Sequence, residues 1–555
     1  MAEQSNRNRL DEGWDALRAG HWRAARACFA DAVESNGLPE AFEGLSWAAW
    51  WLDDAEALFE AREQAFRLYR KRGDAASAAR MATWLASDQL DFHGALAVAS
   101  GWLDRARRLL EPLSHGPDHG WLAFHQGFMA SIKGDLDAAE AHGVLAATLG
   151  REFCVPDLEM LGLALEGTTL VSRARVQDGM RCLDEASAIA LAGEATIPIS
   201  GAWTCCFLVT ACTRVLDFQR AFEWCDQIAR FAERYGSRYM LGYCRDEYAT
   251  IFLWRGEWTA AETALNEAIE AFSPSRPPLV SGPLVQLAEL RRRQGRADDA
   301  ERLLQRAGAT AGAQLCRAEL ALDRVDAAQA LDLTERVLRA ADDARPLDKL
   351  PALDVRVRAQ LACGRVDDAA SAVQTLTDIA RAVGTTALLA RASLSAGRLA
   401  AARGDGTRAT SLLEEAIDGF DKCRARFDAA RARIELAEAL RALGRSADAR
   451  REAQAAHACL RELGAGPDIE RARRMVHRCD STGGGQPALI SRRETDVLCL
   501  LSEGLTNRQI SERLFISEHT VHRHVTNILR KLDVSSRAAA AAYAVRAGLA
   551  GGRRE

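Results

Sequence analysis

Apolar residues recur at helical spacing along most of the chain, from Gly13 to about Met475. In the segment EWTAAETALNEAIEAF, one stripe of the helix surface is formed by Trp258, Ala261, Leu265, Ala268, Ile269 and Phe272. Proline is scarce in this region and clusters in SPSRPP (Ser273–Pro278), where we expect a break. The pattern predicts an all-α fold built from many amphipathic helices.

A turn residue followed by paired small residues recurs along this region, and several successive copies are 39 to 41 residues apart. The clearest copies begin at Gly20, Gly134, Gly256, Gly295, Asp323, Gly364, Gly404 and Gly444. Self-similarity at this period is typical of a solenoid of helical hairpins. Glycine permits the tight turn, small alanines let the second helix pack closely, and neighbouring hairpins must stack to bury their apolar stripes.

The first copy, GHWRAARACFADAV, resembles the turn and second helix of a tetratricopeptide repeat. The matching positions are Gly20, Trp22, Ala25, Phe29 and Ala32. The resemblance extends loosely over residues 9–475, with a period longer than the family's usual value of about 34. It implies a concave groove that binds a protein or peptide, and a small-molecule effector is an alternative occupant.

Charge separates the end of the chain from the rest. Residues 487–555 carry eleven Arg and Lys against seven Asp and Glu, whereas the whole chain has a formal charge of −5. A basic tail on an acidic body indicates that only the tail meets a polyanion. We therefore expect a repeat array at 1–480, a glycine-rich linker at 481–488 and a separate domain at 489–555.

Capping signals divide the tail into four helices. Two capping boxes and one single cap are predicted at Ser491 with Glu494, Thr506 with Gln509, and Ser517. The fourth helix is expected to begin at Ser535. Two short helices joined by a tight turn are typical of a helix-turn-helix, whose second helix enters the major groove of DNA.

The third tail helix has two faces of different character. Its inner face is predicted to contain Val521, Val525, Ile528, Leu529 and Leu532. Its outer face is predicted to contain His519, His522, Arg523, Thr526 and Arg530. His524 lies near the inner stripe, so we interpret it as a packed core residue.

The stretches SRRE, EGLTNRQI and ISEHTVHRHVTNILRKL resemble the DNA-binding domain of LuxR-type bacterial transcriptional regulators. The resemblance implies base reading by His522, Arg523 and Thr526, and it implies a dimerising fourth helix. Backbone contacts are expected from Asn507, Arg508, Thr520, Arg530 and Lys531. The family often carries lysine where this chain has His522. Histidine is mostly neutral at pH 7, whereas the Arg523 guanidinium can address guanine N7 and O6 together.

Other residues suggested alternative sites. His115, His119 and His125 have metal-ligand chemistry, but loop composition explains them better, so no metal is predicted. The tryptophans that fit either a ligand pocket or the core are Trp47, Trp50, Trp51, Trp102, Trp203 and Trp254, and core packing is favoured. No phosphate-binding loop or hydrolase motif is present, so we predict neither an enzyme nor a cofactor.

These observations predict a bacterial transcription regulator controlled through its array. Its expected partners are double-stranded promoter DNA, an effector on the array, and a second copy of the chain on DNA. An alternative is an interaction scaffold whose tail contacts RNA polymerase or another protein, with only incidental DNA binding. The uncharged run Ala195–Thr213 is interpreted as a buried helix rather than a membrane span, and the protein is expected in the cytoplasm.

Overall fold

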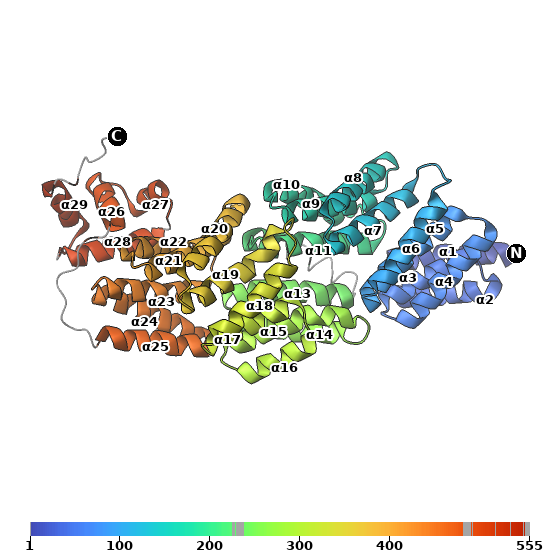
Figure 1. Cartoon of the computed structure of the whole chain (residues 1–555). Helices are drawn as coiled ribbons and strands as arrows, with labels where there is room; N and C mark the ends of the chain where they lie inside the picture. The colour runs from blue at the N-terminus through green and yellow to red at the C-terminus, as the bar shows by residue number, and fades with distance from the viewer. Residues whose placement is uncertain are drawn as a thin grey trace.

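A computed structural model describes residues 2–224, 228, 238–480, 490, 492–516, 518–532, 534–547 and 549. Across these ranges the chain is helical and contains no strand, which confirms the all-α prediction. A tetratricopeptide-like solenoid is followed by a small helix-turn-helix domain. The helix-turn-helix domain lies against the last repeats at one end of an elongated molecule, and the N-terminus lies at the other end (Figure 1).

The first part of the solenoid contains α1 (Ala2–Arg18), α2 (Trp22–Asn36), α3 (Pro39–Trp51), α4 (Ala55–Arg72), α5 (Ala75–His93), α6 (Leu96–Leu110), α7 (Pro117–Lys133), α8 (Leu136–Glu152), α9 (Pro156–Ser172), α10 (Val176–Leu191), α11 (Pro198–Arg214), α13 (Arg238–Arg255) and α14 (Trp258–Phe272). A short 3-10 helix, η1 (Pro277–Val280), follows at the predicted break. The array continues across it, because α14 and α15 remain in contact.

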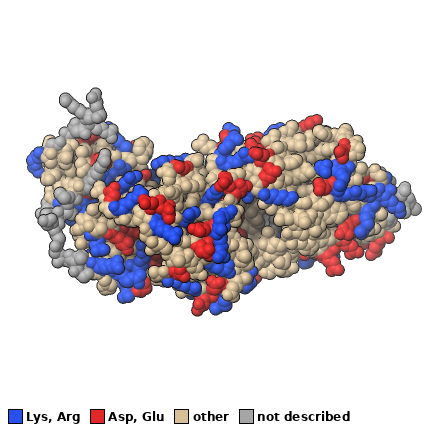
Figure 2. Space-filling model, in the orientation of Figure 1, with Lys and Arg blue, Asp and Glu red and all other residues tan. Residues whose placement is uncertain are grey.

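The second part contains α15 (Ser281–Arg293), α16 (Ala297–Ala307), α17 (Ala311–Asp323), α18 (Ala327–Ala340), α19 (Pro346–Ala362), α20 (Val366–Val383), α21 (Thr386–Ala402), α22 (Gly406–Lys422), α23 (Arg426–Ala442), α24 (Ser446–Leu463) and α25 (Gly466–Asp480). The tail domain contains α26 (Arg492–Ser502), α27 (Asn507–Leu514), α28 (Glu518–Lys531) and α29 (Arg537–Arg546). Basic and acidic side chains are interspersed over the visible face of the array (Figure 2).

The predicted repeat turns are confirmed by the backbone. All seven glycines that open repeat copies have left-handed φ values between 73° and 89°. In the eighth copy the left-handed residue is Val325, at φ 64°. The turn therefore keeps its shape where the sequence lacks glycine. The left-handed conformation is sterically strained there, because valine is β-branched.

Small residues bring the helices of the array unusually close together. A Cβ added to Gly162 in α9 would lie 2.3 Å from the backbone nitrogen of Ala147 in α8. A Cβ on Gly150 in α8 would lie 2.4 Å from the nitrogen of Glu159. These helices pack backbone to backbone, which explains why alanine and glycine dominate the repeats.

A ladder of buried arginine–carboxylate pairs joins the first helices of successive repeats. Arg358 in α19 pairs with Glu319 in α17, and Arg398 in α21 lies 3.3 Å from a carboxylate oxygen of Glu435 in α23. Arg471 in α25 continues the ladder to the same carboxylate at 2.9 Å. Nearby arginines hold the pKa of Glu435 at about 2 despite its burial, so the ladder stays charged.

Polar contacts between distant parts of the sequence join successive turns of the solenoid. Arg276, just before η1, is buried and pairs with Asp53, between α3 and α4. The Thr385 hydroxyl donates to the carbonyl oxygen of Val215 at 2.7 Å, and the Trp254 indole donates to that of Cys423 at 3.0 Å. Each contact spans more than 160 residues, so the solenoid coils back on itself.

The ambiguous tryptophans pack in or against the apolar core, as predicted, whereas only His125 of the three clustered histidines is buried. Trp47, Trp50, Trp51 and Trp254 are buried in one large apolar cluster. Trp102 packs at the edge of a smaller cluster, and Trp203 also lines a small aromatic pocket. His125 is buried beside Trp84, and burial lowers its pKa to about 3.

His119 has a structural role at the start of α7. Its Nδ1 accepts a hydrogen bond from the backbone nitrogen of Gly116 at 3.3 Å. Within the described ranges, no three His, Cys, Asp or Glu side chains are grouped so as to hold a metal ion. The uncharged run interpreted as a buried helix forms α11, and none of the described helices combines the length and apolar character needed to cross a bilayer.

Candidate nucleic-acid interface

The helix-turn-helix is formed by α27 and α28. The capping box expected at the start of α27 is present: the Gln509 backbone nitrogen donates to the Thr506 hydroxyl at 3.3 Å, and the Thr506 nitrogen donates to the Gln509 side chain at 2.9 Å. Ile510 is completely buried, as predicted. The chain turns at Phe515, whose φ of 54° ends α27, and α28 begins three residues later.

The tail domain has its own apolar core, into which α28 places its inner face. The predicted residues Val521, Val525 and Ile528 are buried there, with Leu529 and Leu532 partly buried beside them. His524 is also buried, which confirms its interpretation as a core residue. Burial, followed by the charge of nearby Arg523, lowers the pKa of His524 to about 3, so this imidazole is neutral.

The remaining predicted caps have different outcomes. Ser491 and Ser517 lie outside the described residues. Glu494 is buried, and its carboxylate pairs with the ammonium of Lys531 within the tail domain. The fourth helix is capped by Ser536, which accepts from the nitrogen of Ala539 at 3.2 Å, one residue later than predicted.

Two of the three predicted base readers are open to solvent. His522 and Thr526 are exposed on α28, and the Thr526 hydroxyl donates to the His522 carbonyl oxygen at 2.9 Å. Of the predicted backbone contacts, Arg508 is 80% exposed and Asn507 accepts from Arg537 at 2.6 Å. The side chain of His519 lies outside the described part of the structure.

The start of α28 is covered by the repeat array instead of facing solvent. Thr520, which is 1% exposed, donates its hydroxyl hydrogen to Asp418 of α22. The third predicted base reader, Arg523, lies 3.9 Å from a carboxylate oxygen of Asp418 and 3.8 Å from one of Glu452 in α24. Burial is opposed by these acids, which raise the pKa of Arg523 and keep it charged.

The surface that receives α28 is acidic. We call it the acidic cradle, and it consists of Glu414 and Asp418 on α22 with Asp448 and Glu452 on α24. Each pair is spaced four residues apart, so both acids lie on one face of their helix. Burial raises the pKa of Glu414 to about 7, and it also raises that of Asp418.

Asp448 connects the cradle to the far end of α28. It pairs with Arg530, lies 3.6 Å from the Lys531 ammonium, and also binds Arg445 and Arg451 of its own helix region at 2.8 and 2.6 Å. These cations hold its pKa below the usual range despite burial. The two predicted phosphate-contacting residues at this end of α28 therefore face carboxylates of the array and of their own domain.

Sequence reasoning did not identify the cradle. The paired acids at spacing four were visible on two successive repeats, 34 residues apart from Glu414 to Asp448. Similar acidic pairs are common on solvated helix faces. Only the docking of α28 distinguishes these four carboxylates from the others in the array.

The tail domain is similar in sequence to known proteins. Residues 488–544 match the model of the luxR family of bacterial regulatory proteins. The transcriptional regulatory protein LiaR of Bacillus subtilis is 56% identical over 57 residues, which cover 10% of this chain and 27% of LiaR. The DNA-binding transcriptional activator DevR/DosR of Mycobacterium tuberculosis is 46% identical over 55 residues, covering 10% and 25%.

The chain therefore spans about a quarter of the length of these relatives. Among solved structures, the apo form of the quorum sensor NprR from B. thuringiensis is 12% identical with a TM-score of 0.36, covering 68% of this chain and 97% of that one. Residues 488–544 thus form a helix-turn-helix domain of the luxR family of bacterial regulatory proteins, and this domain follows a solenoid of helical hairpins.

Proposed function

We propose that this protein is a sequence-specific DNA-binding transcription regulator whose repeat array controls access to α28. The array holds the helix in a closed arrangement, and an effector that binds the array shifts the molecule toward an open one. The observation that carries this proposal is the burial of Thr520 and Arg523 against Asp418 and Glu452. We place the protein in the cytoplasm, where promoter DNA is its target.

The closed and DNA-bound arrangements exclude each other, because both use the same donors. When the protein is bound to DNA, the Arg523 guanidinium would donate to acceptor atoms of guanine, and the Thr520 hydroxyl would donate to a phosphate oxygen. In the closed arrangement, Asp418 accepts from the Thr520 hydroxyl, and Arg523 lies within 4.0 Å of carboxylate oxygens of Asp418 and Glu452. The cradle thus presents negative charge to α28 much as a DNA backbone would.

The proposed reading residues have separate tasks. His522, Arg523 and Thr526 read base edges, with Arg523 the main source of specificity. The proposed backbone contacts are Asn507, Arg508, Thr520, Arg530 and Lys531. For Lys531 this requires a rearrangement, because its ammonium pairs with Glu494 inside the tail domain.

We propose that the protein binds DNA as a homodimer on two half-sites. The exposed side of α29 supports this, since Tyr543 and Val545 remain 37% and 59% exposed there. An effector that is a protein, a peptide or a small molecule would act on the array. Any such effector needs a higher affinity for the open form than for the closed one.

The test begins with selection of DNA sites by the full chain carrying Asp418→Asn and Glu452→Gln, which should favour the open form. The affinity for the selected site is then measured against salt. Phosphate contacts predict a steep linear loss on logarithmic axes. Arg523→Ala should cost about 1–3 kcal/mol on the selected site and little on random DNA.

A flat salt response, or equal loss on both DNAs, would instead favour a scaffold whose tail contacts RNA polymerase or another protein. In that case Arg523→Ala should weaken binding to that protein and leave residual DNA binding unchanged.

A further inference from the structure

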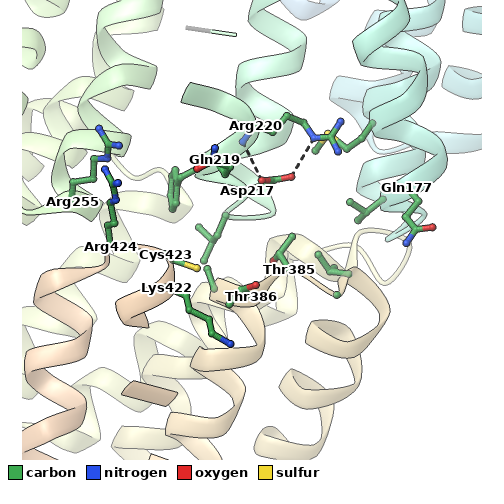
Figure 3. A pocket seen from close by; sticks show the side chains of 17 residues that line it. Gln177, Asp217, Gln219, Arg220, Arg255, Thr385, Thr386, Lys422, Cys423 and Arg424 are labelled. Atoms are coloured by element: carbon green, nitrogen blue, oxygen red, sulfur yellow. Dashed lines mark hydrogen bonds and ion pairs between the residues drawn. The ribbon is translucent and has the colours of Figure 1, made fainter. Parts of the chain in front are cut away.

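We propose that a pocket in the seam of the solenoid binds a small organic anion, which is the effector class that acts on α28. This rests on the proposed function above. The pocket has a volume of about 450 Å³ and lies where the turns after α11, α20 and α22 approach the start of α10 (Figure 3). Its size suits a small metabolite rather than a folded partner.

Four basic residues line the seam pocket, and they come from two parts of the chain. Arg220 and Arg255 come from the turn after α11 and the end of α13, and Lys422 and Arg424 come from the turn after α22. In Figure 3, Arg255 and Arg424 lie on the same side of the pocket. Among the described lining residues, these four basic residues stand against one acid, Asp217.

That acid is already occupied. Asp217 accepts from the Arg220 guanidinium at 3.2 Å, and Arg220 also pairs with Asp184. Arg255 has only a distant carboxylate, that of Glu257 at 3.8 Å. Among the described residues, Lys422 and Arg424 have no carboxylate within 4.0 Å. Arg255 and Arg424 therefore lie on one side of the pocket with no carboxylate closer than 3.8 Å among the described residues, and a bound anionic group would neutralise them.

The rest of the pocket is suited to an apolar or hydroxylated body. Met180, Phe218 and Val383 contribute apolar surface, and Thr386 contributes a hydroxyl group. Thr385 is already engaged across the seam with Val215. A ligand with a charged group at the arginines and an apolar portion on this surface would use both halves of the pocket.

The pocket and the acidic cradle share helix α22. Lys422, at the end of that helix, donates from its ammonium to the carbonyl oxygen of Phe515 at 3.3 Å, in the turn before α28. Asp418, one helical turn earlier, holds Thr520. An anion that draws Lys422 into the pocket removes one contact with the tail domain and acts on the helix that carries another. Binding therefore favours the open form.

Isothermal titration of the full chain with phenyl phosphate tests the pocket, with phenol and inorganic phosphate as the two halves of the probe. We expect saturable binding of phenyl phosphate that is tighter than that of either half. Arg255→Gln and Arg424→Gln should each weaken it about tenfold, as loss of a charge-assisted hydrogen bond predicts. Arg424→Lys should restore most of it.

The matched control is Arg408→Gln, which removes an exposed arginine from the start of α22, outside the pocket. It should bind phenyl phosphate like the unaltered chain. Lack of saturable binding, or equal weakening by the control, overturns the pocket. Unchanged thermal unfolding of each variant without probe confirms that it is folded.

A second readout separates this inference from the proposed function. Phenyl phosphate should increase the affinity of the full chain for its selected DNA site, and Arg424→Gln should abolish that increase. Binding of the probe without any change in DNA affinity overturns its role as an effector. In either negative case, tight DNA binding by the Asp418→Asn/Glu452→Gln variant would leave the proposed function intact.

Discussion

Different kinds of interaction stabilise the interior of the solenoid and its contact with α28. Inside the array, helices meet backbone to backbone and large apolar side chains are buried. At the acidic cradle, charged and hydroxyl groups meet, and Arg523 keeps 17% of its side chain exposed. A polar contact of this kind can separate without exposing an apolar core, whereas the repeats cannot.

The largest expected effect is a loss of stability in the closely packed helices of the array. Gly162→Ala places a methyl group 2.3 Å from the backbone of α8, so the two helices must move apart, at a cost of about 3 kcal/mol. Gly101→Ala is the matched control, because no atom lies within 4 Å of its added Cβ. It should stabilise the chain by up to about 1 kcal/mol. Equal unfolding midpoints for the two variants would refute the close packing.

A second effect belongs to the tail domain and depends on pH. His524 is buried with a pKa of about 3, below its usual 6.5, so the unfolded state binds more protons between these values. Stability of the domain should therefore fall as pH drops below 6.5, by about 2 kcal/mol at pH 5. His524→Gln should flatten this dependence in thermal unfolding, while exposed His522→Gln should leave it in place.

The third expected effect is a change in DNA affinity when α28 loses its contacts with the acidic cradle. Asp418→Asn with Glu452→Gln should raise the DNA affinity of the full chain about tenfold, because the closed form loses both carboxylate partners of Arg523. Glu415→Gln, on the exposed side of the same helix, serves as the control. Gel-shift titrations that give one affinity for all three chains would contradict the closed arrangement.

The smallest expected effect concerns the contact proposed between Arg508 and the DNA backbone. Arg508 is exposed in the closed form, so its removal should act on DNA binding alone. Arg508→Gln, introduced into the Asp418→Asn/Glu452→Gln chain, should reduce the slope of log affinity against log salt by about one. Arg381→Gln, on an exposed face of α20, should not alter the slope.

Much of the fold could be predicted from the sequence because local signals repeat. Glycine at turn positions, alanine in second helices and the Thr506–Gln509 box each act within a few residues of chain. The same locality explains the slip at the fourth helix, since Ser535 and Ser536 carry equivalent capping groups. Val325 shows that a repeat turn keeps its left-handed residue where the local glycine signal is missing.

The closed arrangement could not be predicted, because it depends on groups far apart in the sequence. Asp418 and Thr520 are separated by 102 residues, and neither has a sequence signature of its partner. Arg523 is predicted to read bases from the start of α28, whereas in this structure it faces carboxylates of the array. The seam pocket is equally non-local, since its basic residues come from turns about 200 residues apart.

The most direct test of control by the array compares two DNA affinities. The isolated segment 488–555 and the full chain are titrated with the same selected site at one salt concentration. The account predicts that the isolated segment binds at least about tenfold more tightly, and that Asp418→Asn/Glu452→Gln removes the difference. Equal affinities for the isolated segment and the unaltered full chain would show that the array does not restrain α28.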